Sequence, residues 1–82
     1  MIDVLYFAWL RERIGVPKEQ VEATFPTVAA LVEYLRAQSD AHALAFSDMS
    51  AVRVAVDQEL TEMSAPLGGA REVAFFPPMT GG

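Results

Sequence analysis

Apolar and polar positions follow two patterns along this chain, one typical of strands and one typical of a helix. The first apolar run, Ile2 to Ala8, predicts a strand. On this strand Val4 and Tyr6 point to one face of a sheet, while Leu5 and Phe7 point to the other. Both faces are apolar and need a cover, and a chain of 82 residues is expected to provide only one of them itself.

The clearest helical pattern begins after Thr27, a good N-cap residue. Apolar residues then recur at the i, i+3, i+4, i+7 spacing of one helix face: Val28, Leu31, Val32 and Leu35. A shorter helix is predicted over Trp9–Ile14, ended by Gly15. Ser39-Asp40 either ends the main helix or caps a second short helix over 41–46, and residues 47–50 are expected to form a loop.

The remaining apolar residues predict further strands over 20–24, 52–56 and 72–76, with a short return segment around Leu60 and Met63. Asp57-Gln58 is expected to turn the chain before that return segment. The last strand is again apolar on both faces. Pro77-Pro78 ends its hydrogen-bonding ladder because neither residue has a backbone N–H.

This order of elements predicts an α+β roll, in which one main helix packs across one face of a mixed sheet. The natural topology brings the first and last strands together in the middle of the sheet. Their second apolar faces then form one exposed patch. We expect one domain over residues 1–78 and a flexible tail over 79–82.

Composition narrows the classes of function. The net charge is -5, and the six basic residues are scattered, so nucleic-acid binding is not expected. The absence of cysteine excludes disulfides and thiolate metal sites and fits a reducing compartment. No apolar stretch approaches the ~18 residues that span a bilayer, and no signal-type N-terminus is present. We therefore expect a cytoplasmic protein without membrane attachment.

Catalytic and metal-binding side chains are not evident in the sequence. His42 is the only histidine and has no acidic cluster at ligand spacing, so a surface position is expected and no metal site is predicted. The acidic residues Asp57, Glu59 and Glu62 lie beside a turn and are expected to be solvated. Neither a nucleophile elbow nor a phosphate-cradling glycine loop occurs. The chain is therefore not expected to be an enzyme by itself.

The C-terminal sequence Met79-Thr80-Gly81-Gly82 carries the candidate chemistry. Fully extended, four residues reach roughly 13–14 Å, and glycines pass through a tunnel that a Cβ would block. The terminal carboxylate is a poor electrophile until it is activated, for example as an acyl-adenylate that a sulfur donor then attacks. An inert, flexible end is the alternative. A Gly-Gly pair alone does not indicate chemistry, since Gly68-Gly69 in the same chain is expected to form only a turn.

Three segments resemble the small-subunit family of molybdopterin synthase. They are residues 75–82 (Phe-Phe-Pro-Pro-Met-Thr-Gly-Gly), residues 4–8 followed by Leu10-Arg11-Glu12, and residues 25–28 leading into Leu31. The similarity extends over nearly the whole chain. Met79 departs mildly from the family, which usually has an aliphatic residue there.

The resemblance implies a ubiquitin-like β-grasp fold and a sulfur-carrier function. The carboxylate of Gly82 would be adenylated by a ubiquitin-activating-type enzyme that uses ATP, and then converted to a thiocarboxylate by a sulfur donor system. Gly81, Thr80 and Met79 would insert into the large synthase subunit, where sulfur passes to cyclic pyranopterin monophosphate. The chain itself would bind no cofactor. Two large and two small subunits would form the complex.

The resemblance also implies a partner surface made of Phe7, Leu60, Phe76 and, less firmly, Arg11. Phe7 lies on the strand face that the chain is not expected to cover itself. Three other functions stay open: a sulfur carrier for thiamine, cysteine or tRNA thiolation; a protein modifier joined through Gly82; and a binding module with an inert tail.

Overall fold

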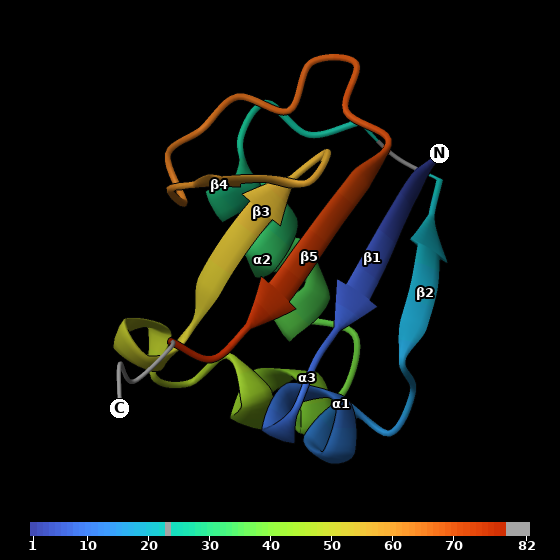
Figure 1. Cartoon of the computed structure of the whole chain (residues 1–82). Helices are drawn as coiled ribbons and strands as arrows, with labels where there is room; N and C mark the ends of the chain where they lie inside the picture. Colours follow the sequence, from blue (N-terminus) through green and yellow to red (C-terminus); the bar gives the residue numbers. More distant parts are fainter. Residues whose placement is uncertain (23, 79–82) are drawn as a thin grey trace.

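The computed structural model describes residues 1–22 and 24–78 and forms one mixed sheet (Figure 1). The strand order is β2-β1-β5-β3-β4. The central strands β1 and β5 are parallel, and the other neighbouring pairs are antiparallel. The bounds are β1 (Ile2–Tyr6), β2 (Lys18–Val21), β3 (Arg53–Val56), β4 (Glu59–Thr61) and β5 (Glu72–Phe76). The prediction that the first and last strands meet in the middle of the sheet is confirmed.

The helices leave one face of the sheet open. Helix α2 lies behind the sheet in Figure 1, and α1 and α3 lie at the end where β1 and β5 finish. The bounds are α1 (Trp9–Ile14), α2 (Val28–Arg36), α3 (Asp40–Ala45) and a 3₁₀ turn, η1 (Met49–Ala51). The predicted α+β roll with one main helix across one face is therefore correct.

Local capping explains where the helices begin and end. Thr27 Oγ1 accepts a hydrogen bond from the Ala30 N–H at 3.2 Å, which satisfies a donor of the first turn of α2. Gly15 ends α1 in the left-handed conformation, with φ of 97°. Ser39 caps α3 through the His42 N–H, so the second of the two interpretations of Ser39-Asp40 is right.

Apart from shifts of one or two residues at other element ends, two predictions of local structure were wrong. The second strand runs over Lys18–Val21 instead of 20–24, because Val21 pairs with Ile2, the first residue of β1. In the predicted loop over 47–50, η1 begins at Met49 and runs on to Ala51, and the side chain of Asp48 caps its first turn. These differences depend on pairing and capping and leave the order of the elements unchanged.

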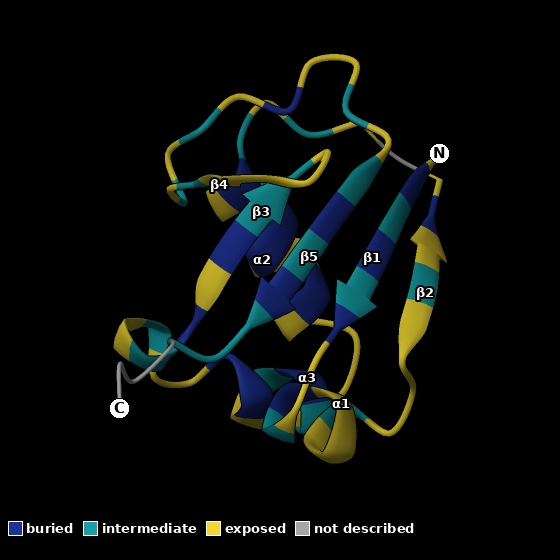
Figure 2. Cartoon of the chain, viewed as in Figure 1, coloured by how far each residue is buried: buried dark blue, intermediate teal, exposed yellow. Residues whose placement is uncertain are grey.

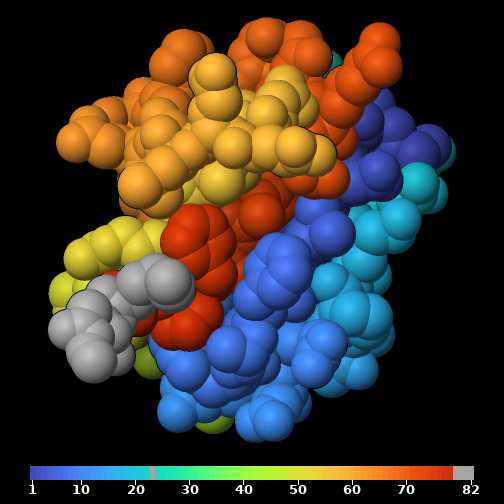
Figure 3. Space-filling view, in the orientation of Figure 1, coloured from blue at the N-terminus to red at the C-terminus, as the bar shows by residue number. Residues whose placement is uncertain are grey.

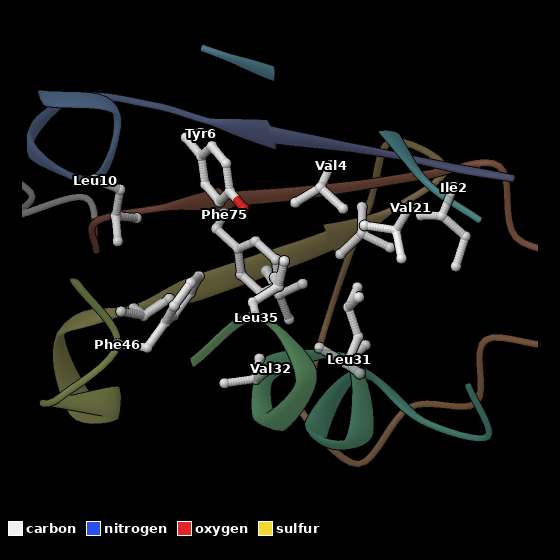
Figure 4. Close-up of a cluster of buried hydrophobic side chains, with 14 of the residues drawn as sticks. Ile2, Val4, Tyr6, Leu10, Val21, Leu31, Val32, Leu35, Phe46 and Phe75 are labelled. Carbon is white, nitrogen blue, oxygen red and sulfur yellow. The ribbon is translucent and has the colours of Figure 1, made fainter. Parts of the chain in front are cut away.

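The core lies between α2 and the inner face of the sheet. Buried and partly exposed residues alternate along β1 and β5, which Figure 2 shows as bands. Tyr6, Phe46 and Phe75 form an aromatic cluster in the core, with the rings of Phe46 and Phe75 edge to face at 5.0 Å (Figure 4). This cluster holds the end of the sheet from which the C-terminal segment leaves.

Candidate functional site

The C-terminal segment leaves the sheet at the end of β5. Phe76 is the last residue of this strand, and the half-buried Pro77 and Pro78 follow it. The predicted reactive residues Met79, Thr80, Gly81 and Gly82 lie outside the described residues. The part of the site that the structure describes is therefore the base from which the predicted tail extends.

Strand register arranges the uncovered outer face into three rows. The row nearest the tail, the tail-end row, contains Phe7, Phe76 and Arg53. The next, the apolar row, crosses four strands and contains Leu5, Ala74, Ala55 and Leu60. The third, the acidic row, contains Asp3 and Glu72, with Asp57 beside them. Figure 3 views the molecule from this side, with β1 and β5 at its centre.

The predicted partner residues lie partly together. Phe7 is 47% exposed and donates its N–H to Phe75 O at 3.1 Å, so it continues the pairing of β1 with β5 and stands beside Phe76. Leu60 is 72% exposed on the edge strand β4. Arg11 is exposed on α1, outside the strand rows. Exposed apolar side chains on a sheet face without a helix are typical of a protein-binding surface.

A strained turn follows Phe7. Ala8 has φ of 54° and ψ of -133°, a conformation that favours glycine, and Leu10 N donates to Phe7 O at 3.2 Å across the turn. Hydrogen bonds therefore hold both the N–H and the carbonyl of Phe7. This local geometry lets the chain leave the sheet immediately after an exposed aromatic residue.

Beneath this end of the sheet lies a polar cluster that sequence reasoning missed. Glu19 Oε2 accepts the Tyr6 hydroxyl at 2.7 Å and lies 2.7 Å from His42 Nε2, and Ser39 Oγ lies 2.7 Å from His42 Nδ1. The predicted surface position of His42 was wrong, because this residue is only 8% exposed. The available signal was Glu19 itself, an acidic residue on the strand face that also carries Val21.

Hydrogen bonding controls the charge state of this cluster. Burial alone raises the pKa of Glu19, but hydrogen bonds from His42 and Tyr6 outweigh it, and the net pKa is lower than usual. Burial, together with the neighbouring Glu19, raises the pKa of Tyr6 well above its ordinary range. Glu19 therefore stays ionised and Tyr6 stays protonated at neutral pH. Ser39 Oγ already caps α3, and we assign the cluster a structural role.

The other acidic residues singled out in the sequence do not form a catalytic pair. Asp57 Oδ1 accepts the N–H groups of Arg71 and Glu72, both at 3.0 Å, and so joins the β3–β4 turn to the start of β5. Glu59 and Glu62 are exposed. Among residues 1–22 and 24–78 there is no group of three potential metal ligands. None of the helices within those ranges is long and apolar enough to cross a membrane.

Solved structures share this fold. SAMP1 from Haloferax volcanii superimposes with a TM-score of 0.73 at 23% identity, covering 99% of this chain and 98% of that one. A candidate molybdopterin converting factor, subunit 1, from Pyrococcus furiosus superimposes with a TM-score of 0.71 at 24% identity, covering 95% and 97%. At these identities the likeness supports the fold alone, and the predicted ubiquitin-like β-grasp architecture is confirmed.

Sequence comparison identifies closer relatives. The chain is 50% identical over 82 residues to the molybdopterin synthase sulfur carrier subunit of Escherichia coli, and the match covers 100% of both chains. The protein of the same name from Haemophilus influenzae is 42% identical over the same length, and that from Mycobacterium tuberculosis is 35% identical. The ThiS family model matches residues 4–82. Because this match covers nearly the whole chain, the protein belongs to the ThiS family.

Proposed function

We propose that this chain is the sulfur-carrier subunit of a molybdopterin synthase and works through the carboxylate of Gly82. The observation that carries the proposal is its 50% identity, over the full length of both chains, to a subunit with that name. Membership of the ThiS family supports a carrier function. The chain is not an enzyme by itself. It presents a reactive group that other proteins charge and use.

The proposed chemistry begins with activation of the carboxylate. An oxygen of the Gly82 carboxylate attacks the α-phosphorus of ATP, pyrophosphate leaves, and the product is an acyl-adenylate. A sulfur donor then displaces AMP at the acyl carbon and leaves a thiocarboxylate. A separate ubiquitin-activating-type enzyme supplies the ATP site and draws on the sulfur donor system, while this chain binds no cofactor.

Transfer of sulfur takes place in a complex. The tail residues Met79, Thr80 and Gly81 enter the large synthase subunit and bring the thiocarboxylate of Gly82 to cyclic pyranopterin monophosphate. Two large and two small subunits make up the assembly, which works in the cytoplasm. Absence of a side chain at both terminal positions keeps the tail narrow enough to enter such a site.

The outer face of the sheet is the proposed docking surface. Phe7 and Phe76 lie at the base of the tail, and Leu60 extends the exposed apolar surface to the edge strand. Burial of such side chains supplies most of the binding energy in protein interfaces. Arg11 on α1 is proposed as a further contact. Docking on this face places the base of the tail, at the end of β5, next to the partner.

Intact mass spectrometry tests the chemistry directly. The purified chain is incubated with ATP, the activating enzyme and a sulfur donor, and replacement of one oxygen by sulfur should add about 16 Da. Deletion of Gly82, or one residue added after it, should abolish both the mass gain and molybdopterin formation, while the denaturant midpoint stays unchanged. Normal molybdopterin formation by either variant would contradict the proposal.

Co-purification distinguishes the other carrier functions. A molybdopterin carrier should bind a large synthase subunit and restore molybdopterin formation in an extract that lacks its own small subunit. Recovery of thiamine, cysteine or tRNA thiolation without molybdopterin would favour another sulfur recipient. Isopeptide adducts through Gly82 would favour a protein modifier.

A further inference from the structure

The charges on the outer sheet face are separated along the strands. Arg53 lies in the tail-end row, opposite Phe76 in the register of β3 and β5. Asp3 and Glu72 pair in the acidic row at the other end of β1 and β5. The four-residue step along β1 from Asp3 to Phe7 corresponds to about 13 Å. The apolar row lies between the two charged rows. On the edge strand β2, Lys18 pairs with Leu5 and forms the end of this row.

Arg53 is available to a partner. Its side chain is exposed, and within residues 1–22 and 24–78 Nη1 donates to two backbone oxygens, those of Ser50 at 3.3 Å and Val52 at 3.5 Å. Of the carboxylates in the described part of the chain, none lies within 4.0 Å of this guanidinium. Arg53 and Glu62 both line a groove at the β3–β4 edge of the sheet, but the carboxylate of Glu62 lies more than 4.0 Å from the guanidinium. The guanidinium of Arg53 therefore forms no ion pair with a described side chain.

The opposite row carries an excess of negative charge. Asp3 receives a hydrogen bond only from the neutral Gln20 side chain, at 3.0 Å, among the bonds described for it. Asp57 adds a third carboxylate, while Arg71 contributes one positive charge to the shallow cavity that it lines with Asp57 and Glu72. Three carboxylates and one guanidinium leave this end negative in a chain whose net charge is already -5.

The two charged rows can distinguish between docking orientations of a partner, which apolar contacts alone cannot do. Burial of the apolar row is favourable in any orientation, because the hydrophobic effect is non-directional. A charged group at each end distinguishes one orientation from its reverse, since the reversed partner places like charges together. Orientation matters for a carrier, because the tail must point to the reacting centre.

We propose that Arg53 and the Asp3–Glu72 row determine the orientation in which the large synthase subunit docks on the sheet. The partner presents an acidic group to Arg53 and a basic group to the acidic row, and this polarity directs the tail into the partner. The inference rests on the proposed function, because it takes the large synthase subunit as the occupant of this face. Arg53 and Glu72 are specificity-determining residues in this scheme and take no part in the chemistry.

Four variants test the proposal through binding to the purified large subunit. Arg53→Glu should weaken binding about tenfold at low salt, mainly through slower association, and less at high salt. Arg53→Gln should give an intermediate loss. Arg36→Glu is the matched control: it makes the same charge change on α2, where Arg36 lies 3.4 Å from Glu33, and it should change binding less than about twofold.

The fourth variant separates orientation from net charge. Arg53→Glu combined with Glu72→Lys keeps the net charge at that of the wild type but reverses the polarity of the face. If polarity sets orientation, this double variant should bind at least as weakly as Arg53→Glu and should transfer sulfur more slowly at saturating partner. Recovery of wild-type binding by the double variant would show that only net charge matters and would overturn the inference.

The outcomes distinguish this inference from the proposed function. If wild-type protein binds the large subunit and transfers sulfur, while Arg53→Glu behaves like Arg36→Glu, the orientation scheme fails and the proposed function stands. If wild-type protein does not bind the large subunit at all, the proposed function fails first. Urea unfolding of each variant identifies those that remain folded, and Arg53→Gln keeps the test valid if a reversed charge destabilises the sheet.

Discussion

The Tyr6 hydroxyl donates a hydrogen bond to Glu19 Oε2 at 2.7 Å, joining residues 13 apart in sequence on neighbouring strands. The Tyr6 ring belongs to the aromatic cluster with Phe75, whose carbonyl accepts the N–H of Phe7. The hydrogen bond therefore connects the edge strand β2 to the end of the sheet where the proposed partner surface begins.

Removal of this hydroxyl should destabilise the fold without creating a cavity. Tyr6→Phe leaves the ring in place but takes one donor from an ionised carboxylate. We expect a loss of about 1–3 kcal/mol in the free energy of unfolding, measured by urea denaturation. Tyr34→Phe on the exposed side of α2 is the control and should change stability by less than about 0.5 kcal/mol. Equal effects of the two changes would contradict the role given to Tyr6.

Glu19 should make the stability of the fold dependent on pH in the acid range. Its pKa in the folded protein lies below the ordinary value of 4.5. A carboxyl group of this kind stabilises the fold above its unfolded pKa, and that contribution is lost as pH falls through its folded pKa. Glu19→Gln should thus be less stable than wild type at neutral pH, with the difference shrinking below pH 4.5.

The measurement is the free energy of unfolding of wild type and Glu19→Gln from neutral pH down to about pH 3. Glu33→Gln is a suitable control, because Glu33 is exposed and its ion pair with Arg36, at 3.4 Å, lies on the surface of α2. A difference between wild type and Glu19→Gln that persists undiminished in acid would refute the ionic role of Glu19.

The β3–β4 turn offers a stabilising substitution. Asp57 and Gln58 both have positive φ, 48° and 71°, which is the pattern of a hairpin turn that favours Asp-Gly. Gln58→Gly should raise the free energy of unfolding by about 0.5–1 kcal/mol, because glycine adopts this conformation without a Cβ clash. Gln58→Ala retains the clash and should bring no such gain. Equal stability of the Gly and Ala variants would exclude strain at this position.

Leu60 should affect binding more than folding. It is 72% exposed, so Leu60→Ala should change stability by less than about 0.5 kcal/mol. Affinity for the large subunit should fall about tenfold if Leu60 is an anchor of the interface. Isothermal titration calorimetry and urea denaturation measure the two effects. A Leu60→Ala protein that binds normally would remove this residue from the proposed surface.

Phe75, in contrast to Leu60, should affect the stability of the fold. Phe75 is fully buried, and its loss should cost about 3–5 kcal/mol of stability. A Phe75→Ala protein as stable as Leu60→Ala would show that the aromatic cluster does not hold this end of the sheet.

Much of the fold could be predicted because its signals are local. The apolar spacing and the Thr27 cap defined α2, and Gly15 marked the end of α1. The topology expected for this order of elements brought β1 and β5 together in the middle of the sheet, as observed. Exposure of Phe7 was also expected, since the chain has one main helix to cover one face.

The polar cluster and the charged rows could not be predicted in this way. His42 becomes buried because α3 places it against Glu19, and Glu19 faces inward because the register of β1 and β2 pairs it with Val4. Arg53 stands beside Phe76 through a pairing of strands that are distant in sequence. Each relationship depends on which strands meet and in which register.

The sequence by itself determined the local elements, the two-sided apolar central strands and the prediction that the chain acts through its C-terminal glycine. Only the tertiary structure decided which polar side chains meet in the interior and how charge is distributed over the open face. The reason is physical: periodicity and caps are set by residues a few positions apart, whereas buried hydrogen bonds and surface charge patterns depend on segments brought together by folding.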